Sequence, residues 1–166
     1  KEAASIVDEK KKTLSTSKDS AETLKQIQTA SESLKSSADQ LTNTGKDSVF
    51  SKSQDEIYKA VDSFVTNYNK LIEGSAKSAS DSITKRVDTL KNMTESNQKL
   101  LSQAGITIGK DDTLTLDRDA FVKADANTVK TLFSGSYSYA SRVSSQSSFI
   151  DSAATQEAAK ANTYTT

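Results

Sequence analysis

The apolar residues of this chain are few, and they recur three, four or seven positions apart, which is the period of one face of an α-helix. Leu, Ile, Val and Phe make up only 32 of the 166 residues, whereas Ser, Thr, Asn and Gln make up 61. So few large apolar side chains do not fill a thick core, but they can form a narrow seam along long helices. Because a narrow seam does not stabilise an isolated helix, each helix is expected to pack against others.

Composition excludes several kinds of site. The chain has no Cys and no His, so it lacks thiolate ligands, disulfides and the commonest general base. Acidic and basic residues number 22 each, a balance that argues against a nucleic-acid-binding protein. No apolar run approaches the roughly 18 residues that a transmembrane helix needs. We therefore expect a non-enzymatic protein that holds no cofactor or metal, binds no nucleic acid and does not insert into a membrane.

Helical spacing predicts long helices over 3–43, 53–73 and 80–104, followed by a terminal helix over 137–161. The short linker between the second and third helices implies that these two form an antiparallel helical hairpin over 53–104. The second helix has the heptad rhythm of a coiled-coil face. Its seam consists of Ile57, Val61, Phe64, Tyr68 and Leu71. These five residues are either internal core, which we favour, or an interface with a partner.

The third predicted helix has a similar seam, but two polar residues interrupt it. Thr94 and Asn97 occupy seam positions, where they are expected to weaken packing. A buried Asn can fix the register of paired helices, and a solvent-facing Asn is the equally good alternative.

The hydrophobic period changes to two between residues 105 and 117, which predicts a β-hairpin. Its apolar residues alternate with Thr and flank a turn-forming segment, Gly109 to Thr113. An isolated two-stranded hairpin is marginal in water, so we expect two short helices, 118–123 and 126–133, to fold back on it. The hairpin unit consists of Gly105, Ile106, Ile108, Leu114, Leu116 and Phe133.

Acidic residues gather around this hairpin, and calcium binding is one interpretation of them. Asp111 and Asp112 lie in the turn, while Asp117 and Asp119 follow the second strand. An EF-hand loop needs oxygen ligands at alternate positions and a closing Glu, and neither is present. Turn and helix-cap roles are therefore the favoured interpretation.

Four stretches of the sequence follow one another in the order that a known protein family shows. Residues 61–72 read Val-Asp-Ser-Phe-Val-Thr-Asn-Tyr-Asn-Lys-Leu-Ile, and residues 100–108 read Leu-Leu-Ser-Gln-Ala-Gly-Ile-Thr-Ile. Residues 111–117 read Asp-Asp-Thr-Leu-Thr-Leu-Asp, and residues 129–133 read Val-Lys-Thr-Leu-Phe. Together they resemble the C-terminal region of the bacterial flagellar filament-capping family, flagellar hook-associated protein 2. The resemblance covers roughly 57–133, and the β-rich domains of that family have no counterpart here.

The resemblance implies a structural protein at the distal end of a growing flagellum. Its partners would be further copies of itself, assembled into a ring, and flagellin, whose subunits the ring guides into the filament. The implied location is extracellular, on the flagellum or as a secreted protein, by an export route without a cleaved signal. The family has no active-site residues to transfer to this chain.

The sequence therefore predicts one elongated domain over 1–166, a mostly α antiparallel helical bundle or coiled coil with one small β-hairpin. The first functional hypothesis is a structural or assembly protein of the filament-cap type that acts through helix packing. The second is a secreted or surface binding or adhesion module that presents a polar or Tyr-bearing face on a helical spacer. A third hypothesis, an enzyme, has no supporting constellation of residues.

Overall fold

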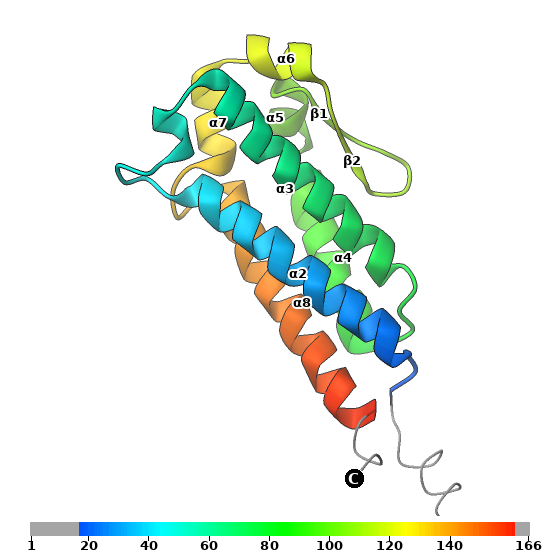
Figure 1. The fold of residues 1–166 in the computed structure, drawn as a ribbon. Coiled ribbons are helices and arrows are strands. Elements are labelled where there is room, and N and C mark those ends of the chain that lie inside the picture. Colours follow the sequence, from blue (N-terminus) through cyan, green and yellow to red (C-terminus); the bar gives the residue numbers. More distant parts are fainter. Residues whose placement is uncertain (1–16, 162–166) are drawn as a thin grey trace, which may run out of the picture.

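The computed structural model describes residues 17–161, and within this range the chain is mostly helical with one two-stranded antiparallel sheet (Figure 1). The long helices are α2 (Ala21–Thr42), α3 (Gln54–Ser75), α4 (Asp81–Ser96) and α8 (Tyr139–Ala161). The shorter elements are η1 (Val49–Ser51), α5 (Gln98–Gln103), β1 (Ile106–Ile108), β2 (Leu114–Leu116), α6 (Arg118–Lys123) and α7 (Ala126–Phe133). The prediction of a mostly helical chain with a small β-hairpin is thus confirmed for these residues.

The four long helices pack so that each has two antiparallel neighbours. Helix α2 lies between α3 and α8, and α4 contacts both α8 and α3 (Figure 1). This arrangement lets each helix turn its apolar seam inward, where the seams meet in one core. Within residues 17–161, no helix combines the length and the apolar character that crossing a membrane requires.

Small residues line much of the contact between α2 and α8. On α2, Ser31 and Ala38 are buried, and on α8, Ala140, Ser144, Ser147 and Ala154 are buried. Small side chains let two helix axes approach closely, because the distance between packed helices depends on the residues at the contact. Helix α8, whose first half is rich in Ser, therefore packs extensively against α2 although it carries few large apolar residues.

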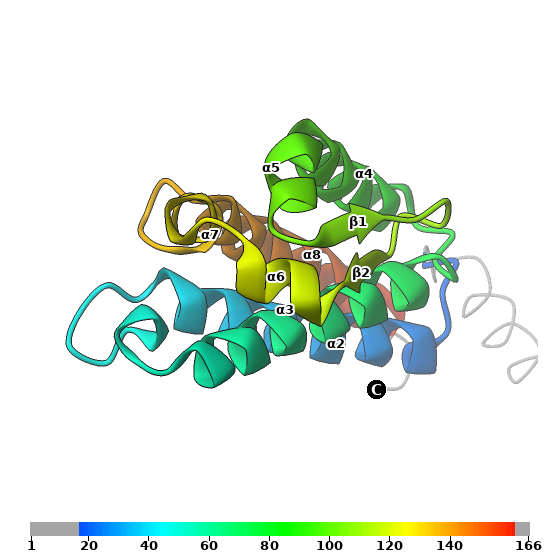
Figure 2. The same cartoon turned by 90° about the horizontal axis from the view of Figure 1, so that it is seen from above.

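The hairpin lies at one end of the long helices, where β1 runs beside α5 and β2 runs beside α3 (Figure 2). Ile106 pairs with Leu116, Thr107 with Thr115 and Ile108 with Leu114. Both Thr side chains are exposed, while Ile106 and Leu114 are buried. The predicted alternation of an apolar face and a Thr face is therefore present, and helices cover the apolar face.

The prediction of one continuous helix over 80–104 is wrong, because the helix is interrupted at Asn97. Helix α4 ends at Ser96 and α5 begins at Gln98. The Asn97 side chain donates to the backbone oxygen of Met93 at 2.8 Å, and the Asn97 backbone oxygen accepts from the Leu101 amide at 2.9 Å. Asn side chains compete in this way for backbone groups, so Asn97 closes one helix and opens the next.

The prediction of a first helix over 3–43 is wrong for residues 17–20, which precede the observed helix. Residues 3–16 of that prediction lie outside the described residues, and helix α2 begins only at Ala21. Ser20 adopts an extended conformation, and its hydroxyl accepts the Thr23 amide proton at 3.1 Å. A Ser in this N-cap position ends the helix on its N-terminal side, because it satisfies an amide that otherwise lacks a partner.

Asp19, next to this cap, ties the start of α2 to the loop between α3 and α4. Its carboxylate accepts the Ala79 amide proton at 2.7 Å and the Ser80 hydroxyl proton at 2.8 Å, and it also accepts from Ser78. Burial alone would raise the pKa of Asp19, but these hydrogen bonds together lower it below its ordinary value of 3.8.

Replacing Asp19 with Asn is therefore expected to destabilise the protein at neutral pH. A lowered carboxyl pKa contributes stability above about pH 4 and loses that contribution as the pH falls further. The stabilities of wild type and Asp19→Asn should thus converge in acid. Urea denaturation followed by circular dichroism at a series of pH values measures this, and a constant difference at all pH values would contradict it.

Candidate functional site

The predicted seam of α3 lies against the other long helices and against α7. Val61, Phe64 and Leu71 are fully buried, Tyr68 is almost so, and Ile57 is partly buried at the edge of the core. The Phe64 ring contacts Phe133 at 5.5 Å and Tyr139 at 5.9 Å between centroids, both edge to face. Four of the five seam residues are therefore internal in the described structure, and Phe64 joins α3, α7 and α8 in one aromatic cluster.

A chain of buried hydroxyl groups crosses this core. The Tyr68 hydroxyl donates to Thr94 Oγ1 at 2.9 Å, and Thr94 Oγ1 lies 2.7 Å from the Tyr139 hydroxyl. Burial raises the pKa of Tyr68 to about 12, and it raises the pKa of Tyr139 well above 10. Sequence reasoning missed this network, because Thr94 seemed only to weaken the third seam. The hydrogen bonds instead fix α3, α4 and α8 relative to one another.

The hairpin unit brings together the six residues predicted for it. Ile106, Leu114 and Phe133 are buried, while Ile108 and Leu116 pack at the edge of the core. Gly105 connects α5 to β1 with a φ of +82°, a conformation that favours glycine. The unit therefore forms one packed end of the molecule.

Asn69 joins this hairpin to α3. The Asn69 side-chain amide donates to the Leu114 backbone oxygen at 2.8 Å, and its oxygen accepts the Leu114 amide proton at 2.7 Å. The side chain thereby pairs with the outer edge of β2 as a neighbouring strand would. No local sequence signal predicts this role of Asn69. The residue lies in the stretch 61–72 that carries the family resemblance, within the pattern Tyr-Asn-x-Leu at 68–71.

Replacing Asn69 with Ala is expected to cost about 1–3 kcal/mol, because it leaves both backbone groups of the buried Leu114 without partners. The Leu114 amide should then exchange faster with solvent deuterium in an NMR measurement. Asn67→Ala is the matched control, since Asn67 bonds to Ser33 and Ser37 of α2 and not to the hairpin. Unchanged Leu114 exchange in Asn69→Ala would contradict the assignment.

The acidic residues around the hairpin have turn, cap and ion-pair roles. Asp111 accepts hydrogen bonds from the Thr113 hydroxyl and the Thr113 amide. Both bonds lower the pKa of Asp111 below 3.8, and the bond from the hydroxyl has the larger effect. Asp112 has a φ of +67° and lies 3.5 Å from Lys91, while Asp117 caps α6. Among the described residues, no cluster of three or more acidic groups could hold a metal ion.

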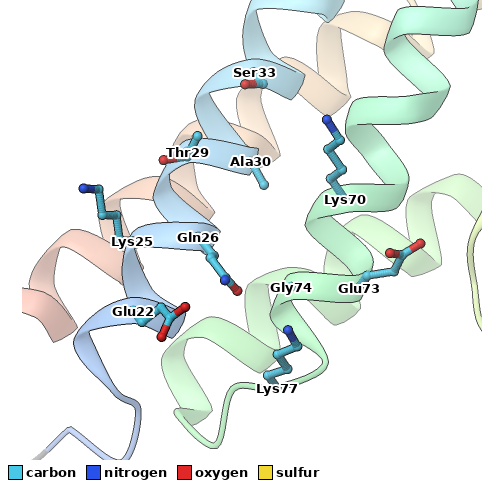
Figure 3. Close-up of a pocket in the computed structure, with 10 residues that line it drawn as sticks. All are labelled: Glu22, Lys25, Gln26, Thr29, Ala30, Ser33, Lys70, Glu73, Gly74 and Lys77. Carbon is cyan, nitrogen blue, oxygen red and sulfur yellow. The ribbon is translucent and has the colours of Figure 1, made fainter.

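A surface groove of about 630 Å³ runs between α2 and α3 (Figure 3). Gln26 and Ala30 of α2 point toward α3, where Gly74 has open space above its Cα (Figure 3). Three Lys and two Glu side chains border the groove. The groove is open to solvent, whereas a small-molecule site usually buries most of its ligand.

Two carboxylates on the outer side of α2 and α8 have shifted pKa values of opposite sign. Burial alone would raise the pKa of Asp39, but hydrogen bonds from Lys35 and Ser144 and the Lys35 charge lower it below 3.8. Burial raises the pKa of Asp151 above 3.8, and the negative charge of Glu32 adds to this effect. Both shifts therefore have their causes in the packing of α2 against α8, through the Lys35 and Ser144 contacts of Asp39 and through the burial of Asp151 beside Glu32.

Comparison with known proteins adds no relative to this description. No protein-family model, no curated protein and no solved structure matches the chain.

Proposed function

We propose that this chain is a non-enzymatic structural protein that acts in assembly through helix packing, in the manner of the flagellar filament cap. Its helices would form an elongated antiparallel bundle that works outside the cell, with further copies of the chain and flagellin as partners. The motif resemblance motivates this proposal, and one feature of the structure supports it.

That feature is the way in which the separate stretches of the resemblance join into one folded unit. The Tyr-Asn-x-Leu segment (68–71) lies on α3, whereas the strand residues and the Val-x-x-Leu-Phe segment (129–133) lie 35 or more positions later. Asn69 of the first segment holds Leu114 of the second strand, and Phe64 packs on Phe133 of the last segment. Motifs that depend on each other structurally are expected to occur together, as they do in the family that the chain resembles.

Location in the cell is the first test of this proposal. The protein would be quantified by mass spectrometry in sheared flagella, culture medium and cytosol of its source cells. The same fractions from cells with disabled flagellar export are the control. Enrichment in sheared filaments that vanishes without export would support the cap-like function. Equal release into the medium in both strains, with none on filaments, would overturn it.

A secreted or surface binding module is the second candidate function. Tyr137, which precedes α8, is 93% exposed, and exposed Tyr residues often serve as contacts in binding sites. Oligomeric state separates the two candidates, because a cap forms rings or binds flagellin whereas a binding module can stay monomeric. Sedimentation velocity of the purified chain, alone and with monomeric flagellin, measures this difference.

A further inference from the structure

A second groove, of about 410 Å³, lies between α4 and α8 on the outside of the molecule. Lys85, Arg86 and Thr89 border it from α4, and Phe149, Ser152 and Gln156 border it from α8. The residues of α8 lie three, four and seven positions apart and those of α4 lie one, three and four positions apart, so each set occupies one side of its helix. The groove is therefore a channel between two parallel ridges, which is the shape that a third helix can occupy.

Phe149 gives this groove an apolar contact point. Its side chain is 45% exposed, one of three large apolar side chains that stand out on the described surface. The Arg86 guanidinium lies over the ring, 4.9 Å from its centroid. This cation–π contact holds both side chains in place, so the groove is partly organised before any partner arrives.

The groove carries positive charge without a compensating carboxylate. Lys85 and Arg86 both border it, no Asp or Glu does, and neither cation belongs to an ion pair among residues 17–161. Elsewhere in the described chain, Lys35, Lys59, Lys91 and Lys160 each lie within 4 Å of an acidic side chain. Other described cations, such as Lys25 and Lys110, also lack an ion pair, so the feature of this groove is that two cations border it together and no Asp or Glu does.

A comparable arrangement within the same molecule shows which group is missing. Arg118 also lies over an aromatic ring, that of Tyr58, at 5.1 Å. There a carboxylate from another helix completes the arrangement, because Asp55 of α3 lies 3.4 Å from the Arg118 guanidinium. Arg86 on Phe149 has the same cation–π geometry without the carboxylate. A carboxylate from a partner can supply the third component, since guanidinium pairs favourably with it.

We propose that the α4–α8 groove docks an acidic amphipathic helix of another protein, with an apolar side chain on Phe149 and Glu or Asp side chains on Lys85 and Arg86. The hydroxyls of Thr89 and Ser152 and the amide of Gln156 would form its polar rim. This inference does not depend on the flagellar assignment, because it follows from charge and shape alone.

The test uses a synthetic probe and the ¹⁵N-labelled chain. The probe is a blocked peptide of about 15 residues with Leu at helical spacing and Glu at the flanking positions. An otherwise identical peptide with Gln in place of Glu is the comparison. Titration is followed by NMR shifts of backbone amides. We expect the Glu peptide to shift amides of α4 and α8 around Phe149, with affinity that falls as salt is added.

Variants assign the binding to the groove. The double variant Lys85→Gln/Arg86→Gln should bind the Glu peptide with an affinity roughly tenfold lower or more, because the charge-assisted contacts are lost. Arg118→Gln, the matched change on the other Arg–aromatic pair, should leave the affinity unchanged. Both cationic side chains are exposed, and circular dichroism checks that the variants fold.

Several outcomes would overturn the proposal. These are equal binding of the Gln peptide, amide shifts centred on another face, no binding of the Glu peptide up to millimolar concentration, or unchanged affinity in the double variant. Vesicles of phosphatidylglycerol serve as a competing probe, because two exposed cations could also attract anionic lipid. Vesicle binding that requires Arg86 and exceeds peptide binding would assign the groove to a membrane surface instead.

Discussion

Replacing Gly105 with Ala is expected to destabilise the protein by about 3 kcal/mol or more, through strain and steric overlap together. The φ of +82° at this position disfavours any residue that carries a Cβ. A Cβ placed there would also lie 2.8 Å from the Phe121 amide nitrogen and 2.9 Å from the Asp117 backbone oxygen. Both atoms belong to the backbone, so a side-chain rotation does not relieve the overlap. Urea denaturation measures the change in free energy of unfolding.

Gly74→Ala is the matched control for this substitution. Gly74 lies one residue before the end of α3, and a Cβ there would contact nothing within 4 Å. Because Ala favours a helix more than Gly does, this variant should gain up to about 1 kcal/mol. The same chemical change is thus expected to have opposite signs at the two sites. A loss below about 1 kcal/mol in Gly105→Ala would show that the turn into β1 adapts to a side chain.

Replacing Phe64 with Ala is expected to cost about 3–5 kcal/mol, the range for large-to-small changes in a core. Phe64 is fully buried, and its ring contacts the rings of Tyr68, Phe133 and Tyr139. Its loss leaves a cavity where three helices meet, and the hydroxyl network beside it restricts their collapse. Denaturant titration measures the change, with two-state unfolding checked by two spectroscopic probes.

Phe149→Ala provides the comparison, because Phe149 is 45% exposed and should lose less than about 1 kcal/mol on truncation. If Phe64→Ala cost less than about 1 kcal/mol instead, Phe64 would not be a core residue in solution. The seam of α3 would then be an interface for a partner, which was the alternative that the sequence left open.

Local signals made much of the secondary structure predictable. Ser53, Asp117 and Asp125 each cap a helix through their own side chain, and the predicted starts after these residues agree with the structure to within one position. The period-two pattern likewise located both strands of the hairpin. Such signals act between residues two to four positions apart, so sequence reasoning captures them.

Interactions between distant segments were not predictable in the same way. Asp19 accepts a hydrogen bond from the loop 60 positions later, and α2 begins two residues after Asp19. Asn69 and Leu114 are 45 positions apart, and either residue alone is unremarkable in the sequence. The α4–α8 groove also depends on residues from two helices that only the fold brings together. Periodicity identified the faces of the helices, but it did not indicate which faces meet.

The Ser- and Ala-lined contact between α2 and α8 has a consequence for how stability depends on temperature. The heat-capacity increase on unfolding comes from apolar surface, and exposed polar surface reduces it. A contact built from hydroxyl and methyl groups therefore contributes less to this increase than one built from Leu and Phe. The free energy of unfolding should then curve less with temperature than is typical for a chain of this length, so that cold weakens the protein comparatively little.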